Sequence, residues 1–137
     1  LIQKGAEVNI VDKQGNSPLL EACEHKHLVL AKYLIECGAD INYANSDGNT
    51  PLHFDYSYSC QDFVEYLIDH IKDINYLNME GNTPLHIACC NGNLDIVKYL
   101  IKNHGADINF VSKYGVTALG ISCKNGNDKI VKFLLDH

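Results

Sequence analysis

Arginine and tryptophan are absent from this sequence, and only three prolines and one methionine occur in it. All 11 basic residues are therefore lysine, and 17 acidic residues outnumber them, which gives a formal net charge of −6 at pH 7. A phosphate backbone would be repelled by this average charge. The side chain that best reads guanine and phosphate in a bidentate manner is also missing. We therefore expect no nucleic-acid partner.

Long apolar runs are absent as well. No stretch approaches the roughly 18–20 apolar residues that cross a bilayer, and residues 1–4 do not begin a basic and then apolar leader. The sequence therefore predicts no membrane contact and shows no signal peptide. Its hydrophobic content of 46% is sufficient for one domain with a sizeable core.

Cysteine is the one residue type that could suggest an exported, disulfide-linked fold, since six are present. The chain can build a core without disulfides, contains no Asn-x-Ser/Thr acceptor for glycosylation, and has its cysteines within helical apolar patterns. We therefore expect free, buried thiols and a reducing, cytoplasmic (intracellular) location. The residues concerned are Cys23, Cys37, Cys60, Cys89, Cys90 and Cys123.

The scarce prolines are regularly spaced, because Pro18, Pro51 and Pro84 follow one another at intervals of 33 residues. Each stands in one recurring phrase, and a fourth copy with alanine in place of proline follows after 34 residues. A second phrase recurs between the copies, after a stretch of helix-spaced apolar residues. Such a period indicates a repeat architecture. The first phrase reads Gly15-Asn16-Ser17-Pro18-Leu19, Gly48-Asn49-Thr50-Pro51-Leu52-His53, Gly81-Asn82-Thr83-Pro84-Leu85-His86 and Gly115-Val116-Thr117-Ala118-Leu119, and the second reads Gly5-Ala6-Glu7-Val8-Asn9, Gly38-Ala39-Asp40-Ile41-Asn42, Ile71-Lys72-Asp73-Ile74-Asn75 and Gly105-Ala106-Asp107-Ile108-Asn109.

Elementary rules for helix starts explain the first phrase. Thr83 supplies a side-chain oxygen that can cap free backbone N–H groups, and Pro84 suits the first helical position, where a missing N–H costs nothing. Leu85 then points inward, and Gly81 permits a turn conformation that a Cβ disfavours. The same reasoning applies to the counterparts in the other units. Each unit is therefore predicted as a hairpin turn, a short helix, a turn and a longer helix.

The phrase Thr83-Pro84-Leu85-His86-Ile87-Ala88 resembles the signature of the ankyrin repeat, and the resemblance covers essentially the whole chain. It implies an all-α ankyrin-repeat solenoid of stacked helix-turn-helix units with β-hairpin-like loops, in which neighbouring units bury one continuous interior. We expect a single domain over 1–137. Its parts are the end of a preceding repeat at 1–11, repeats at 12–44, 45–77 and 78–111, and a truncated last repeat at 112–137.

Two features depart from the family pattern. Asp55 stands where Ala22 and Ala88 pack, so its carboxylate is expected to need a partner in the interior. Neither end of the array shows the polar cap that solenoids usually carry. We expect that the natural protein continues on both sides or that its ends are covered by self-association.

Two groups of potential metal ligands occur, His86-x-x-Cys89-Cys90 and Cys23-x-His25-x-His27. Zinc needs four converging ligands, whereas repeat position explains these residues as packing and capping groups. A cysteine hydrolase would need a nucleophile, a base and an oxyanion site in one pocket, and no glycine-rich phosphate loop is present. We therefore expect no metal, no cofactor and no catalytic residue.

The resemblance implies that a protein partner contacts the hairpin tips and the exposed side of the first helices, which together form a concave face. Tyr58, Met79 and Tyr114 are the strongest candidates, because interface energy concentrates in a few large side chains. Asp47 and Glu80 make the centre of the face acidic, which favours a basic partner surface. The predicted contact residues are Lys13, Gln14, Asn16, Glu24, His25, Ser46, Asp47, Asn49, Ser57, Tyr58, Met79, Glu80, Asn82, Cys90, Asn91, Lys113, Tyr114, Val116, Lys124 and Asn125.

Two further columns, that is, sets of residues at the same position in successive repeats, have alternative interpretations. Ile10, Tyr43, Tyr76 and Phe110, followed by Val11, Ala44, Leu77 and Val111, could stack as a ladder between neighbouring hairpins or form a stripe that binds a partner. Asn42, Asn75 and Asn109 resemble asparagines that hydroxylases modify in some ankyrin proteins, although local hydrogen bonding is the simpler explanation.

The sequence thus predicts a non-catalytic scaffold that binds a protein partner through its concave face and hairpin tips. Two alternatives stay open. The segment could be the recruiting or inhibitory ankyrin region of a larger enzyme, such as a kinase or a ubiquitin-ligase adaptor, or it could be a bare structural spacer.

Overall fold

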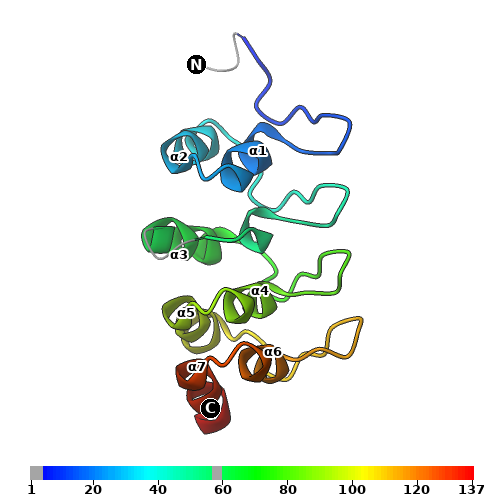
Figure 1. Cartoon of the computed structure of the whole chain (residues 1–137). Coiled ribbons are helices and arrows are strands. Elements are labelled where there is room, and N and C mark those ends of the chain that lie inside the picture. Colours follow the sequence, from blue (N-terminus) through cyan, green and yellow to red (C-terminus); the bar gives the residue numbers. More distant parts are fainter. Residues whose placement is uncertain (1–4, 57–59) are drawn as a thin grey trace.

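The computed structural model describes residues 5–56 and 60–137, and this part of the chain contains helices and loops but no strand. Pairs of helices are stacked in line, and long loops project from one side as fingers (Figure 1). This arrangement confirms the predicted all-α solenoid. The helices are α1 Pro18–Glu24, α2 Leu28–Glu36, α3 Gln61–His70, α4 Pro84–Cys90, α5 Leu94–His104, α6 Ala118–Lys124 and α7 Asp128–Asp136, and η2 Pro51–His53 is a 3₁₀ turn.

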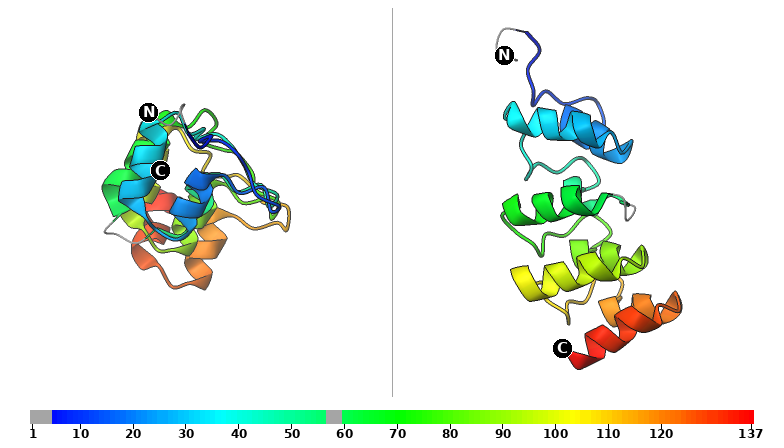
Figure 2. Two further views of the ribbon diagram at one scale, coloured as in Figure 1. Left: turned by 90° about the horizontal axis from the view of Figure 1, so that it is seen from above. Right: turned by 90° about the vertical axis from the view of Figure 1, so that its left-hand side faces the viewer.

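The stack has two layers of helices. The first helices of the units (α1, η2, α4, α6) lie next to the fingers, and the second helices (α2, α3, α5, α7) form the outer layer (Figures 1 and 2). Consecutive members of a layer pack on one another, as α4 does on α6 and α3 on α5. None of the described helices is long and apolar enough to cross a membrane.

The first helices begin as predicted. The side-chain oxygens of Ser17, Thr83 and Thr117 accept hydrogen bonds from backbone N–H groups in the first turn, and Thr50 does so for η2. Pro84 occupies the start of its helix. Such caps satisfy N–H groups that otherwise lack partners. The register derived from the proline spacing is therefore confirmed.

The interior is one continuous apolar cluster shared by all units. Leu19, Leu52 and Leu85 occupy the same repeat position in the first helices, and all three are buried. Leu67 and Leu100 are their fully buried counterparts in the outer layer. No single unit encloses this cluster, so its stability depends on stacking.

The second unit differs from its neighbours because its first helix is only the single turn η2. Phe54 already has extended backbone, and Tyr56 fills the core position that Cys23 and Cys89 occupy elsewhere, where its hydroxyl donates to the Pro51 carbonyl over 2.7 Å. The expectation that Asp55 is buried is therefore wrong. The helix ends before this residue, and its carboxylate stays in water.

No disulfide joins the six cysteines, all of which lie in the described chain, but only Cys23, Cys60 and Cys89 are buried. The prediction of burial is wrong for Cys90, at the end of α4, and for Cys123, since both are exposed. Cys123 occupies the same column as Cys89, but no further unit of the described chain covers it. Burial raises the pKa of the Cys23 and Cys89 thiols to about 11.

The extra residue of the third unit is accommodated by a longer outer helix. α5 extends to His104 and ends at Gly105, whose left-handed conformation (φ 64°) stops the helix. His104 Nε2 lies 2.8 Å from Asp69 Oδ1 in α3, and the Tyr99 hydroxyl donates to the same oxygen over 2.7 Å. These contacts lower the pKa of the Asp69 carboxyl, through Tyr99 first, and raise the pKa of Tyr99 to about 12. The insertion thus joins two units.

Candidate partner-binding surface

Each finger is closed by a short polar residue at its start. In the second finger, Asn45 Oδ1 accepts from the backbone N–H groups of Asp47 and Asn49, both over 3.0 Å. Asp12 and Asn78 do the same in the first and third fingers, and Ser112 supports the fourth through one bond. Such turns mimic a backbone turn and fix the loop shape. The fingers are therefore built by local hydrogen bonds, and no strand ladder is assigned in the described chain.

Neighbouring fingers are also bonded to each other. The Ser46 N–H donates to the Gln14 carbonyl over 3.2 Å, and the Met79 N–H donates to the Asp47 carbonyl over 2.8 Å. These bonds hold the first three fingers in a row, so the tips are presented on a rigid support.

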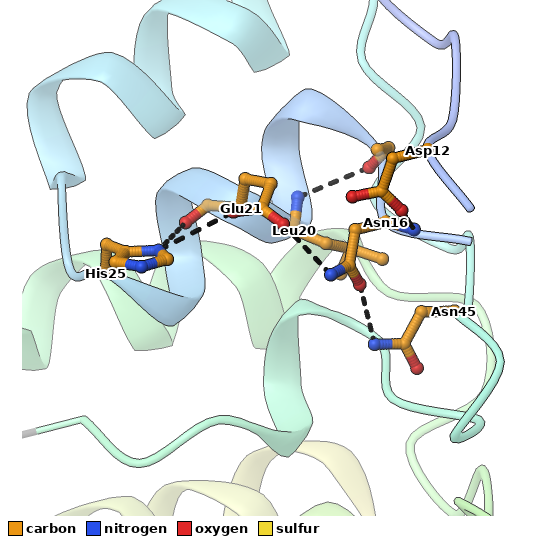
Figure 3. A network of polar contacts seen from close by, with 7 residues as sticks. Asp12, Asn16, Leu20, Glu21, His25 and Asn45 are labelled. Atoms are coloured by element: carbon orange, nitrogen blue, oxygen red, sulfur yellow. Dashed lines mark hydrogen bonds and ion pairs between the residues drawn. The ribbon is translucent and has the colours of Figure 1, made fainter. Parts of the chain in front are cut away.

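Side-chain amides add a second line of bonds along the row. Asn45 Nδ2 donates to Asn16 Oδ1 over 2.8 Å (Figure 3), and Asn78 Nδ2 donates to Asn49 Oδ1 over 3.0 Å. We predicted Asn16 and Asn49 as partner contacts, but their amide oxygens are occupied between fingers and both residues are only half-exposed. Asn82 is likewise half-exposed and donates to Glu80 over 3.3 Å. These asparagines therefore help to shape and position the fingers, and their contact with a partner stays a prediction.

Two buried histidines connect the first helices to the fingers that follow them. The backbone N–H of Thr50 donates to His53 Nδ1 over 3.1 Å, so Nδ1 carries no proton. Nε2–H therefore donates, and it faces the carbonyls of Tyr76 at 3.1 Å and Asn82 at 3.2 Å. His86 repeats this arrangement one unit later. Each imidazole thus fixes the next finger in place.

Burial lowers the pKa of both imidazoles below the ordinary value of 6.5, against the opposing effect of the carbonyls that they face. The unfolded chain therefore binds more protons at mildly acidic pH, and stability is expected to fall as the pH drops below about 6.5. Urea unfolding at pH 7.5 and pH 5.0 measures the effect. The variant His86→Gln should be less stable at pH 7.5 and lose less between the two values, and an unchanged pH dependence would contradict this assignment.

In the column that could form a ladder or a partner-binding stripe, two aromatic side chains pack on buried histidines. Tyr76 packs edge-on against His53, and Phe110 packs edge-on against His86, each with ring centres 6.1 Å apart. These aromatics therefore pack on the first helix of their own unit. Tyr76 still keeps an exposed side.

The asparagines of the second phrase bridge consecutive units at the opposite end of the loops. Asn9 Oδ1 accepts from the Asp40 N–H over 2.9 Å, and Asn42 Oδ1 accepts from the Lys72 N–H over 2.8 Å. Asn75 repeats the contact with the next unit. Their occurrence is explained by these bonds.

The remaining predicted contact residues of the described chain are solvent-exposed. Ser57 and Tyr58 lie outside the described residues. Met79 and Tyr114 have the largest exposed apolar side chains of the set, at 66% and 70%, and Val116 is also exposed. The structure thus places the expected anchors at the finger tips and leaves them accessible.

Three further exposed apolar residues are outside the predicted contact set but belong to the column that the sequence left open between a ladder and a partner-binding stripe. Val11, Leu77 and Val111 precede the finger turns, and each is more than a third exposed. The sequence contains a signal for these residues, because an apolar residue recurs at this repeat position although the position lies outside the helices and the core. Together with Met79 and Tyr114 they give the fingers an apolar stripe, here called the finger stripe.

Charge is unevenly distributed over the first helices and fingers. In the first three units the exposed acidic residues Glu24, Asp47 and Glu80 outnumber the exposed Lys13 at the first finger tip, whereas Lys113 and Lys124 are exposed in the fourth. In the first unit a polar network leads from Asn45 through Asn16 to Glu21 and His25 (Figure 3), in which Asn16 Nδ2 donates to Glu21 Oε1 over 3.0 Å. The face is therefore acidic over most of its length and basic at one end.

The two groups of potential metal ligands in the sequence are split between the core and the surface. Cys89 is buried in the core while Cys90 faces solvent, and Cys23 is buried while His25 and His27 are exposed. In the described part of the chain, the only group of three or more potential ligands whose donor atoms all lie within 4.8 Å of one another is Glu21, Glu24 and His25. These residues lie at the exposed end of the polar network in α1.

Comparison with known families agrees with this geometry. Two overlapping segments, residues 1–78 and 61–137, match the family model described as ankyrin repeats (3 copies), so the two matches together span the chain. No curated protein matches it. The matched segments contain all four helix starts that the repeated phrase predicts.

Proposed function

The chain belongs to the ankyrin repeat family, whose members generally act in protein–protein interaction, and we propose that it is a non-catalytic scaffold that holds a protein partner on its fingers and concave face. The finger stripe is the observation that carries this proposal. Large apolar side chains are exposed at the tips of loops whose backbones are fixed by hydrogen bonds. Exposed apolar patches on otherwise satisfied surfaces mark interaction sites.

Rigidity and exposure together favour binding. Removing apolar surface from water contributes roughly 25 cal/mol per Å², and a loop that is already ordered loses little further entropy when a partner binds. Met79 and Tyr114 project from such loops. They fit the role of anchors, around which polar neighbours supply complementarity.

Charge indicates the kind of partner surface. Glu24, Asp47 and Glu80 give the first three units an acidic face, so a basic segment would be attracted and oriented there. Cys23 and Cys89 are packed in the core as thiols, which is consistent with a reducing compartment inside the cell. The raised pKa of Cys23 and Cys89 supports the non-catalytic part of the proposal, because thiolates rather than thiols are nucleophiles.

The test is affinity capture from cells of the source organism, followed by identification of the enriched protein and direct titration of that protein. Replacing Met79 and Tyr114 by serine should weaken its binding by about tenfold or more, since truncated anchors typically cost more than about 1 kcal/mol each. Val29→Ser is the matched control, because Val29 is 86% exposed on α2, away from the fingers. Equal binding by the double variant, or an equal loss with Val29→Ser, would contradict the proposal.

A further inference from the structure

The fourth unit lacks the imidazole that fills the space beside the cap in the two units before it. Gly120 stands at the repeat position of His53 and His86. A Cβ at Gly120 would lie 3.2 Å from Thr117 Oγ1 and, apart from its chain neighbours and the backbone of its own helix, within 4 Å of no other atom of the described chain. The missing side chain therefore leaves open space next to the helix start.

A groove of about 410 Å³ occupies this region. The groove is here called the unit-4 groove. Its lining includes Val116 and Thr117 from the finger, Gly120, Ile121 and Lys124 from α6, and Cys90 from the unit before. Its volume falls within the range of about 300–1,000 Å³ that is typical of ligand sites.

Hydrogen bonds hold the walls of this groove in place. The Val116 carbonyl lies 3.2 Å from His86 Nε2, and the Val116 N–H donates to Ser112 Oγ over 3.1 Å. On the opposite side, Asn125 Nδ2 donates to the Cys90 carbonyl over 3.2 Å. The groove is therefore preformed, and an occupant need not order it.

The chemistry of the lining is apolar with one positive charge. Val116 and Ile121 contribute aliphatic surface, and Lys124 contributes the only charged side chain of the described lining. In α1 the repeat positions of Ile121 and Lys124 are held by Glu21 and Glu24. The same part of the face therefore changes from acidic in the first unit to apolar and basic in the fourth.

We propose that the unit-4 groove receives a bulky aliphatic side chain of the partner, next to a carboxylate that pairs with Lys124. The inference rests on the proposed function, since the occupant is a segment of the protein partner. The aliphatic group covers Val116 and Ile121, and the carboxylate complements a cation in a described lining without acidic side chains. The first three units are mainly acidic, so the complementary surface of the partner changes from basic to acidic along the stack. This change fixes the orientation of the partner on the scaffold.

The smallest probe of this chemistry is 4-methylpentanoate, which joins a leucine-like body to a carboxylate. Titration into the ¹⁵N-labelled 137-residue chain should shift the amide signals of Val116, Gly120 and Ile121, with a dissociation constant of about 1–10 mM for so small a ligand. The neutral 4-methylpentanamide should bind about 2–5-fold more weakly, as expected for loss of one exposed ion pair. 4-Methylpentylamine should bind most weakly.

Two variants separate the contributions. Lys124→Gln should weaken binding of the carboxylate to the level of the amide and leave amide binding unchanged, whereas Lys129→Gln, at an exposed lysine of α7, should have no effect. Gly120→His should abolish binding of both probes, because an imidazole beside Thr117 fills the space as it does in the third unit. If circular dichroism shows that this variant does not fold, the comparison of Lys124→Gln with Lys129→Gln provides the test.

Absence of shifts in the groove, equal binding of the amine and the carboxylate, or carboxylate binding that does not depend on Lys124 would overturn the inference. These results would leave the proposed function untouched if Met79→Ser/Tyr114→Ser still impairs capture of the partner. Conversely, the probe could bind the groove while the partner binds equally well after the finger stripe is altered. This result would refute the proposed function and leave the chemistry of the groove in place.

Discussion

Replacing Leu85 by alanine is expected to lower the free energy of unfolding by about 2–5 kcal/mol, through lost transfer free energy and the cavity left behind. Leu85 is only 2% exposed and lies in α4, in the apolar cluster shared by the units. Its replacement removes contacts within the third unit and across its boundaries. Urea unfolding followed by circular dichroism at pH 7.5 measures the loss.

Leu119→Ala is the matched control, because Leu119 occupies the same repeat position in α6 but is only half-buried. Less apolar surface returns to water there, and no further unit of the described chain packs on that side. Its loss should be less than half of that at Leu85. Equal losses at the two positions, or a loss at Leu85 below about 1 kcal/mol, would contradict the stacked interior.

The parts of this fold that follow local rules could be predicted from the sequence. A threonine, a proline and an inward leucine in succession specify a capped helix start wherever they occur, and the 33-residue spacing of Pro18, Pro51 and Pro84 placed those starts correctly. Glycine at each finger turn could be placed for the same reason, since the positive φ angles there exclude most side chains.

The errors concern features that depend on partners distant in the sequence. Alignment alone assigns Asp55 to the interior, but burial of Tyr56 in the core coincides with an early helix end that leaves the carboxylate outside. The hydrogen bonds that Asn16 and Asn49 accept from the next finger could not be predicted for the same reason, and their contact with a partner stays a prediction. Burial of Cys123 depends on a unit that the described chain does not provide. The position of a residue within the repeat indicates the surroundings of its side chain only when the neighbouring unit is known.

The candidate site likewise has one part that the sequence predicts and another that depends on the folded arrangement. The exposure of the anchors Met79 and Tyr114 could be predicted, because the finger tips project from the stack and side chains there lie outside the core. The unit-4 groove was not predicted. It arises from the absence of an imidazole at Gly120 combined with a finger position fixed by His86, and this combination is visible only in three dimensions.

Gly81→Ala should destabilise the chain by about 2–5 kcal/mol, because two penalties act at one residue. Its φ of +77° is a left-handed conformation, which costs roughly 1–2 kcal/mol for alanine. Its Cβ would also lie 2.5 Å from the Lys113 backbone nitrogen, so the fourth finger must move, at a cost typical of overpacking of about 1–3 kcal/mol.

Gly115→Ala separates the two penalties, since Gly115 has nearly the same φ, +75°, at the corresponding turn, but a Cβ there would have no atom of the described chain within 4 Å apart from those of its two chain neighbours. Urea unfolding should therefore show a loss of about 1–2 kcal/mol at Gly115 from backbone strain alone. The excess at Gly81 measures how firmly the third and fourth fingers are packed together. Equal losses would mean that the fourth finger yields freely. The Val116 rim of the unit-4 groove would then not be held in place, and the preformed character of that groove would be lost with it.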